Sequence, residues 1–338
     1  MTAPTKQLVL CVAPWYPSNP VRWMADAFER VGCNVVRIGP TYNDHMDMEW
    51  PDSDKVKPDL RLPRALRKWR LDAMVDWCTT NFRAPDLLFT SEENYRTDID
   101  TVDKIPHVLW SCDGWPENYE RVDLWRPTVA YHNHPLGIRI HPRTEEHPRW
   151  KFMPGACAPW VHRDLGMERI YDWVLFATMY GQRPAICAYV TARGLKTLYG
   201  KANIQEYVEH HNRALSTLHN ANGQVEVKWR FFETAAMGCV NITDHTPLLA
   251  RLGYQPMIHF VQVPVLWADD EPWPSMESVA TMVEVLKVNR KRWKSISDAA
   301  KQYTLNHHTY FHRIRTIFQD LGMGSMVEAC DEQIGKIE

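Results

Sequence analysis

The chain alternates short apolar runs with longer stretches in which apolar residues recur every three or four positions. Residues 8–12 (LVLCV) form a continuous apolar run, typical of a strand buried on both faces of a parallel sheet. Residues 21–31 carry apolar side chains at helical spacing and stop at Gly32, and residues 34–38 (NVVRI) form a second run. A strand, a helix and a strand in this order predict a βαβ unit, the start of a doubly wound α/β sheet.

The same pattern extends through the first half of the chain. It predicts a helix at 64–82 and strands at 85–89, 106–110 and 127–131. Residues 40–63 and 132–164 show little periodicity, and the second of these stretches is rich in proline. Because such stretches separate compact domains, we expect a domain boundary within 132–164.

A second α/β pattern follows the proline-rich stretch. It predicts strands at 173–176, 195–199, 240–243 and within 257–265, and helices at 184–192, 203–216, 231–237, 276–303 and 310–321. Two such patterns in succession predict two Rossmann-like lobes with a ligand-binding cleft between them. The chain has no GxGxxG and no GxxxxGK[ST], so neither a dinucleotide fingerprint nor a P-loop is indicated.

Composition narrows the class of protein. The 338 residues are 45% hydrophobic and 24% charged, which is the globular range and excludes disordered, collagen-like and coiled-coil proteins. No apolar run approaches the roughly 18 residues of a membrane helix, and the amino-terminal apolar stretch is too short for a signal peptide. Eight cysteines without a CxxC pair argue against a zinc cluster and a disulfide framework. We therefore expect a soluble protein of the bacterial or phage-infected host cytoplasm.

Charge leaves room for a local anion site. The net charge of −2 predicts no strong field over the whole molecule, but it does not exclude a basic patch. The most informative segment is 227–244 (VKWRFFETAAMGCVNITD), which predicts a helix that ends at Gly238 and then a strand. Glu233 lies among apolar neighbours, where a carboxylate is costly without a partner, and two ribose hydroxyls would supply one. Lys228, Arg230 and the amino end of the helix suit a diphosphate.

This segment resembles the FE-x-x-A-x-G-x-x-x-x-x-D core of GT-B glycosyltransferases, in particular the spore-maturation CgeB-like family. Three further stretches are similar to that family: 171–183 (YDWVLFATMYGQR), 195–200 (LKTLYG) and 307–313 (HHTYFHR). The resemblance covers residues 170–320, and the first half matches only in outline, through FERVGCNVVRI and HVLWSCDGWP. It implies an α/β GT-B fold with two Rossmann-like lobes facing across a cleft.

The resemblance also implies a division of labour along the chain. Residues 1–155 would form the acceptor-side lobe and residues 156–305 the lobe that binds a nucleotide sugar. Residues 306–338 would form a helical segment that crosses back to the first lobe. The residues assigned to the donor are Glu233 for the ribose, Arg230, Lys228 and Arg183 for the diphosphate, and Thr178 to Gly181 for a close backbone approach.

The expected co-substrate is a nucleoside-diphosphate sugar, a UDP-sugar in the first place. No metal and no further cofactor are implied, because basic side chains and helix dipoles screen the leaving diphosphate in GT-B enzymes. One departure concerns the second glutamate that many of these enzymes carry eight residues before the ribose glutamate. Val225 occupies that position here, and Glu226 is one residue away, so a donor role for Glu226 is left open.

Candidates on the acceptor side follow the strands of the first half. Asp113 comes directly after the strand at 106–110 and is a candidate base for an acceptor hydroxyl, with turn capping as the alternative. Trp15 and Tyr16 follow the first strand and would form an aromatic platform or pack internally. The histidines at 307, 308 and 312 lack a carboxylate or cysteine to complete a metal set and are interpreted as structural.

The predicted function is transfer of a sugar from the nucleotide donor to an acceptor hydroxyl. The acceptor would be a hydroxymethylated pyrimidine in phage DNA, a protein side chain or a surface glycan. With DNA, the basic run at 57–70 would contact phosphates. A non-catalytic module that binds nucleotide sugars and a sugar-nucleotide epimerase are the alternatives from other classes. Sugar identity, anomeric outcome and oligomeric state stay open.

Overall fold

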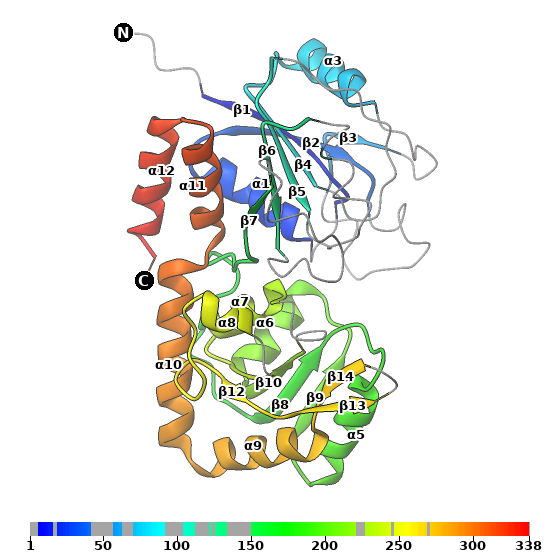
Figure 1. The fold of residues 1–338 in the computed structure, drawn as a ribbon, viewed down its shortest axis with the longest axis vertical. Coiled ribbons are helices and arrows are strands. Elements are labelled where there is room, and N and C mark those ends of the chain that lie inside the picture. The colour runs from blue at the N-terminus through cyan, green and yellow to red at the C-terminus, as the bar shows by residue number, and fades with distance from the viewer. Residues whose placement is uncertain are drawn as a thin grey trace. The chain divides into compact units, whose positions relative to one another are not determined.

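The computed structural model describes residues 6–15, 19–41, 57–62, 70–91, 104–111, 122, 126–133, 150–220, 227–244, 247–268 and 271–337. The chain divides into two compact units, Met1–Pro154 with Tyr310–Lys336 and Gly155–Thr309 (Figure 1). Each unit is built on its own parallel sheet. None of the helices in the described ranges combines the length and the apolarity that a membrane crossing requires.

The first unit contains a seven-stranded sheet in which every neighbouring pair is parallel, in the order β3-β2-β1-β4-β5-β6-β7. Its strands are β1 (Leu8–Val12), β2 (Asn34–Gly39), β3 (Leu60–Arg61), β4 (Leu87–Ser91), β5 (His107–Ser111), β6 (Val129–His132) and β7 (Trp150–Phe152). Its helices are α1 (Pro20–Arg30), α3 (Leu71–Asn81), α11 (Tyr310–Asp320) and α12 (Gly324–Ile334).

Apolar side chains on both faces of this sheet form the core of the first unit. Leu8, Leu10 and Val12 alternate along β1 and belong to the cluster that includes the buried face of α3. On α1, the Phe28 ring contacts Phe89 of β4 at 5.7 Å and Phe318 of α11 at 5.6 Å between centroids. The helix α11, from the end of the chain, therefore completes the core of the amino-terminal unit.

The second unit contains a five-stranded parallel sheet in the order β12-β11-β10-β8-β9, and a separate antiparallel pair, β13 with β14. Its strands are β8 (Tyr171–Phe176), β9 (Thr197–Gly200), β10 (Ala214–His219), β11 (Val240–Thr243), β12 (Val261–Gln262), β13 (Val265–Ala268) and β14 (Glu271–Pro274). Its helices are α5 (Arg183–Ala192), α6 (Ile204–Asn212), α7 (Trp229–Ala236), α8 (Pro247–Arg251), α9 (Met276–Val288) and α10 (Arg290–His307).

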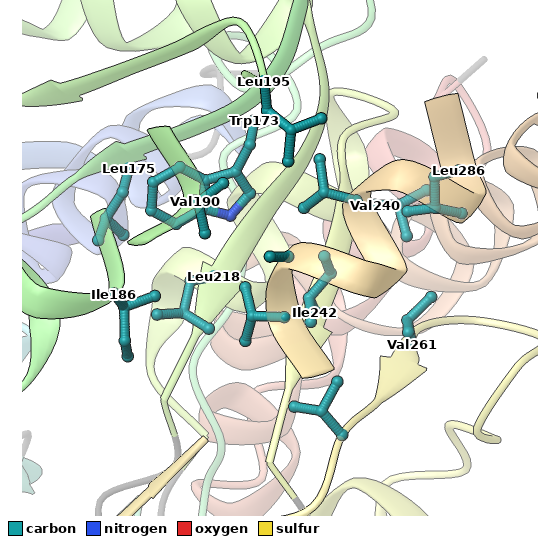
Figure 2. Packing of buried hydrophobic residues seen from close by; sticks show 14 of the residues in the cluster. Trp173, Leu175, Ile186, Val190, Leu195, Leu218, Val240, Ile242, Val261 and Leu286 are labelled. Atoms are coloured by element: carbon teal, nitrogen blue, oxygen red, sulfur yellow. The ribbon is translucent and has the colours of Figure 1, made fainter. Parts of the chain in front are cut away.

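Both faces of this second sheet are covered as well. Trp173 and Leu175 of β8 pack in a cluster with residues of α5 and α9, which Figure 2 shows from close by. Val174 and Phe176, which point to the opposite face, pack near Tyr207 of α6. The continuous apolar pattern of β8 is thus explained by burial on two sides.

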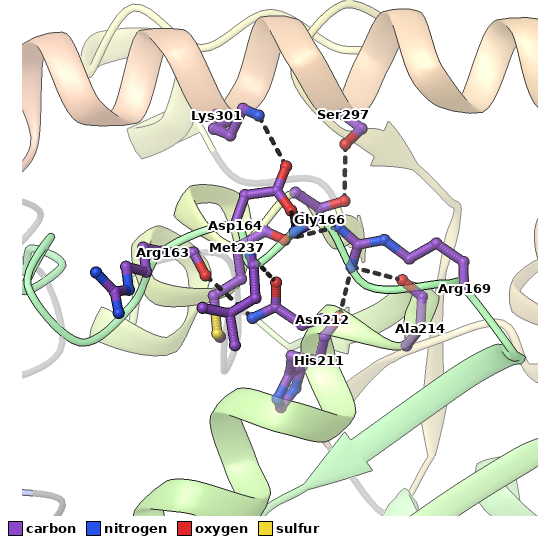
Figure 3. Close-up of polar contacts among 12 residues, drawn as sticks. Arg163, Asp164, Gly166, Arg169, His211, Asn212, Ala214, Met237, Ser297 and Lys301 are labelled. Carbon is purple, nitrogen blue, oxygen red and sulfur yellow. Dashed lines mark hydrogen bonds and ion pairs between the residues drawn. The ribbon is translucent and has the colours of Figure 1, made fainter. Parts of the chain in front are cut away.

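A polar cluster around Arg169 joins several elements of the second unit (Figure 3). The guanidinium donates to the backbone carbonyls of His211 at 2.7 Å, Ala214 at 3.2 Å and Met237 at 2.9 Å. Asp164 lies 3.4 Å away and also accepts from Lys301 at 2.8 Å. These bonds satisfy carbonyls where α6 and α7 end, so Arg169 holds the two helices in place.

Most predicted elements are confirmed with small shifts of their ends, and three are corrected. The helix predicted at 203–216 ends with α6 at Asn212, and the next residues form the central strand β10, because a fully buried apolar run fits either structure. The helix predicted at 276–303 is two helices, since the Asn289 side chain accepts from the Arg292 N–H and caps α10. The helix predicted at 64–82 is not continuous, because Arg70 is extended; α3 covers Leu71–Asn81, and residues 63–69 lie outside the described ranges.

Five elements were not predicted: the strands β3, β7 and β14 and the helices α8 and α12. The strands β3 and β7 have two and three residues, which is too short for a periodic pattern. The helix α12 has only Cys330 fully buried, so its apolar stripe is weak.

Candidate functional site

Three chain segments meet at one edge of the sheet in the second unit. The neighbouring strands β8, β10 and β11 end at Phe176, His219 and Thr243, and all run in the same direction. The turn that starts at Thr178 follows β8, and α7 follows β10. Since parallel α/β sheets bind ligands beyond the carboxyl ends of their strands, this edge is the candidate site.

The position of α7 at this edge is fixed by packing and by side-chain hydrogen bonds. Phe231 and Phe232 are fully buried. The Thr234 hydroxyl donates to Oδ1 of Asn241 on β11 at 2.9 Å, and the Asn241 amide donates to the Phe231 carbonyl at 3.0 Å. At the amino end, Lys228 is the N-cap residue, and no side chain in the described ranges caps the helix. In its first turn the Phe231 N–H donates to the Lys228 carbonyl at 3.0 Å, and the other N–H groups are ones that an α-helix leaves without an intrahelical partner.

Glu233 is buried on α7, with 6% of its surface exposed. Its Oε2 atom accepts a hydrogen bond of 2.9 Å from the Tyr207 hydroxyl. Its Oε1 atom lies 3.7 Å from Nε2 of His162. The His162 Nδ1 accepts from the Ala158 N–H at 3.1 Å, so Nε2 is the ring nitrogen that carries the proton. Within the described part of the chain, no donor lies within hydrogen-bond distance of Oε1.

Burial raises the pKa of Glu233 from its ordinary value near 4.5 to about 7. The Tyr207 hydroxyl and the nearby charge of Arg230 oppose this rise. A buried carboxylate that keeps one oxygen without a donor is costly, and a guest with hydroxyl groups would relieve that cost. The arrangement can therefore bind a hydroxyl-bearing ligand.

Three basic side chains lie at the same edge of the sheet and differ in their exposure. Lys228 and Arg230 lie at the start of α7 and are partly exposed. Arg183 is buried, and its Nη1 donates to the Thr178 carbonyl at 2.8 Å. Its guanidinium lies 4.1 Å from the centre of the Tyr180 ring. Arg183 thus shapes the turn after β8, while the two residues on α7 keep part of their surface in solvent.

Gly181 allows this turn to pack against β14. Its φ of +54° lies in the left-handed region. A Cβ atom built there would collide with the Trp273 ring. A side chain at this position would therefore both strain the backbone and displace the ring.

Of the two alternatives for Trp15, an aromatic platform and internal packing, the structure shows internal packing. The Trp15 side chain is fully buried, and its indole N–H donates to the Ile38 carbonyl at 3.0 Å. A ring in that position packs in the core and has no face for a ligand. Tyr16, Asp113 and Glu226 lie outside the described residues. Throughout the described ranges, no group of three or more His, Cys, Asp or Glu residues is arranged to hold a metal ion.

Comparison with known proteins agrees with this geometry. Residues 179–319 match the family model described as glycosyl transferase-like. No curated protein sequence matches the chain. A glycosyltransferase from Rickettsia africae superimposes with a TM-score of 0.60 at 9% identity, covering 98% of this chain and 100% of that one. Anabaena Alr3699/HepE in complex with UDP-glucose superimposes with a TM-score of 0.59 at 11% identity, covering 94% of this chain and 99% of that one.

A third solved structure is the DNA-modifying enzyme β-glucosyltransferase, with a TM-score of 0.51 at 9% identity, covering 96% of this chain and 99% of that one. This chain has the GT-B fold. The predicted fold class, α/β with two Rossmann-like lobes, is therefore confirmed. The family match is limited to residues 179–319, and the solved structures are similar to this chain in fold.

Two residues of the candidate site, Tyr207 and His162, were not identified from the sequence. Tyr207 precedes Glu233 by 26 positions and belongs to another helix. His162 lies on a turn before the first strand of the unit. No local pattern links either residue to Glu233, because only the folded chain brings them together.

Proposed function

We propose that this GT-B protein is a metal-independent glycosyltransferase that moves a sugar from a nucleoside-diphosphate donor to an acceptor hydroxyl. The observation that carries the proposal is the buried Glu233 carboxylate, with one oxygen held by Tyr207 and the other without a donor from the part of the chain that the structure describes. Two adjacent ribose hydroxyls are donors of the right chemistry, because an ionised carboxylate only accepts hydrogen bonds. Hydrogen bonds to a charged acceptor in a buried site are strong.

The diphosphate would lie at the amino end of α7. Lys228 and Arg230 would supply positive charge there, and the amino end of the helix would add its dipole and hydrogen-bond donors. The turn from Thr178 to Gly181, closed by Arg183, would approach the donor with its backbone. These groups would stabilise the leaving diphosphate without a metal ion.

A UDP-sugar is the donor that we propose, since Anabaena Alr3699/HepE was solved with UDP-glucose and with UDP. The CgeB-like subgroup and a cytoplasmic location belong to the same proposal. Seven described cysteines are free and buried, which fits a reducing compartment.

Donor binding and turnover test the function directly. Calorimetry with UDP, GDP and ADP would identify the nucleotide, and a screen of the matching sugar donors would follow release of the nucleoside diphosphate. Binding followed by release on addition of an acceptor supports the proposal. Binding without release under any acceptor favours a non-catalytic binding module, and conversion of the donor without an acceptor favours an epimerase. Absence of both binding and release refutes the proposed function.

The acceptor that we propose is a hydroxymethylated pyrimidine in DNA, bound by residues 1–155 with Asp113 as base. The likeness in fold to a DNA-modifying β-glucosyltransferase supports this choice. The test is transfer of labelled sugar to duplex DNA with and without hydroxymethylated bases, alongside protein and glycan acceptors. DNA binding should weaken steeply as salt increases, because Lys and Arg contacts to phosphate release counterions. Labelling of protein or glycan alone would overturn the DNA assignment.

A further inference from the structure

We propose that Tyr207 is a positioning residue that fixes the Glu233 carboxylate, so that Oε1 faces the ribose 2′-hydroxyl of the donor. The inference rests on the proposed function and adds a residue to which nothing in the sequence pattern assigned a role. The 2.9 Å hydrogen bond from the Tyr207 hydroxyl to Oε2 carries it.

Tyr207 is itself held firmly. It lies on α6, whose amino end is closed by a reciprocal capping box between Asn203 and Glu206. Its ring contacts the His211 ring at 4.3 Å and the His162 ring at 6.3 Å between centroids. Its backbone carbonyl is 2.7 Å from Nδ1 of His211. A hydroxyl on a ring with these contacts defines one position for the oxygen that accepts from it.

The carboxylate needs such a partner to have a fixed orientation. The last torsion of a glutamate side chain is soft, so an unanchored carboxylate rotates over a broad range. The Tyr207 bond removes this freedom by occupying Oε2. The other oxygen, 3.7 Å from His162 Nε2, then keeps its accepting capacity for a ligand.

The charged and titratable groups around Glu233 come from each element packed against it. They are Arg230 on α7, Tyr207 and His211 on α6, His162 on the turn that precedes β8, and Cys239 directly before β11. Burial lowers the pKa of His211 to about 3 and raises the pKa of Cys239 to about 12, so both are neutral near pH 7. Because Tyr207 lowers the pKa of Glu233, removal of its hydroxyl should raise that pKa further.

The experiment compares UDP with 2′-deoxy-UDP on the full chain, by calorimetry from pH 6 to pH 9. The variants are Tyr207→Phe and, as a matched control, Tyr303→Phe, which removes a hydroxyl that donates to the Leu252 carbonyl at 2.9 Å elsewhere in the unit. We expect Tyr207→Phe to weaken UDP binding about tenfold, the scale of a hydrogen bond to a charged group, and to leave 2′-deoxy-UDP binding nearly unchanged. The pH at which UDP affinity falls should also move upward. Tyr303→Phe should leave the affinities for UDP and for 2′-deoxy-UDP unchanged.

Equal weakening of both nucleotides by Tyr207→Phe would show a merely structural role and would overturn the inference. Unchanged UDP binding, or an unchanged pH profile, would overturn it as well. A wild-type protein that binds UDP and 2′-deoxy-UDP equally would instead refute the ribose role of Glu233 in the proposed function, and the role of Tyr207 would fail with it.

Discussion

Two charged side chains in the second unit, the partly buried Arg169 and the buried Glu233, differ in how completely the protein satisfies them. Arg169 donates to three backbone carbonyls and lies beside Asp164, and its guanidinium is 5.7 Å from the centre of the Trp293 ring. Among the described residues, Glu233 accepts one hydrogen bond, from Tyr207, and its other oxygen lies 3.7 Å from His162.

The difference separates a structural charge from a candidate ligand-binding one. A buried charge that the protein satisfies fully stabilises the fold, because its loss leaves several polar partners unpaired. A buried charge that is satisfied only in part costs stability, and that cost is relieved when a ligand binds. Substitution of the first should therefore reduce stability, and substitution of the second should reduce binding.

The largest effect is expected for Arg169→Met. Three carbonyls would lose the guanidinium donor and Asp164 would keep only Lys301 as a cationic partner, so the free energy of unfolding should fall by about 3 kcal/mol. Urea denaturation followed by tryptophan fluorescence measures the change. Nucleotide affinity of the folded variant should change by less than about threefold. If the variant lost nucleotide affinity without losing stability, Arg169 would not be a structural charge, and the distinction from Glu233 would be wrong.

Next in size is the effect of Glu233→Gln on nucleotide binding. The substitution keeps the shape and removes the charge that accepts from the ribose, so UDP affinity should fall about a hundredfold, which corresponds to about 2.7 kcal/mol. Calorimetry at pH 8 measures it, with Arg169→Met as the reverse control. If binding and stability decreased together, Glu233 would be a core residue.

The same variant should also change the pH dependence of stability. In the folded protein the pKa of Glu233 is raised from near 4.5 to about 7, so the folded state holds the proton more tightly than the unfolded state. Stability from this group is therefore present at low pH and is lost as pH rises from 4.5 to 7, by on the order of 2 kcal/mol. Glu233→Gln should remove this decrease and be more stable than the wild type at pH 8 without ligand. Parallel stability curves for the two proteins would contradict the burial of an ionised carboxylate.

The smallest effect is expected for Lys294→Ala. The Lys294–Asp298 pair joins residues four apart on the exposed face of α10 at 2.9 Å. Exposed pairs contribute little, so unfolding free energy should change by less than about 0.5 kcal/mol and UDP affinity should not change. A larger effect in either assay would mean that the assays do not distinguish local from global changes.

The sequence predicted the fold better than it predicted the site. The strand β11 was predicted at its observed residues, 240–243, since a short apolar run after a helix-ending glycine is unambiguous. The strand β10 was taken as helix, because a strand buried on both faces lacks the alternation that distinguishes strand from helix. Long-range packing decides whether such a buried run forms a strand or a helix, and the spacing of apolar residues along the chain does not report that packing.

At the site, Glu233 was predicted because a carboxylate among apolar residues conflicts with its surroundings. Tyr207 and His162 were not predicted, because a neutral tyrosine or histidine side chain is compatible with apolar surroundings and gives no signal in the sequence. For Trp15 the sequence left a platform and internal packing open, since loop position alone does not show whether a ring packs inward, and the structure shows internal packing. Sequence therefore indicates the group that needs partners, and the folded structure identifies the partners.

The most direct test is a crystal structure of the protein with UDP. The account predicts a ribose hydroxyl within about 3.2 Å of Glu233 Oε1, with Tyr207 still bonded to Oε2 and the diphosphate at the amino end of α7. A ribose bound elsewhere, with the Glu233 carboxylate unchanged and without contact to the nucleotide, would contradict it.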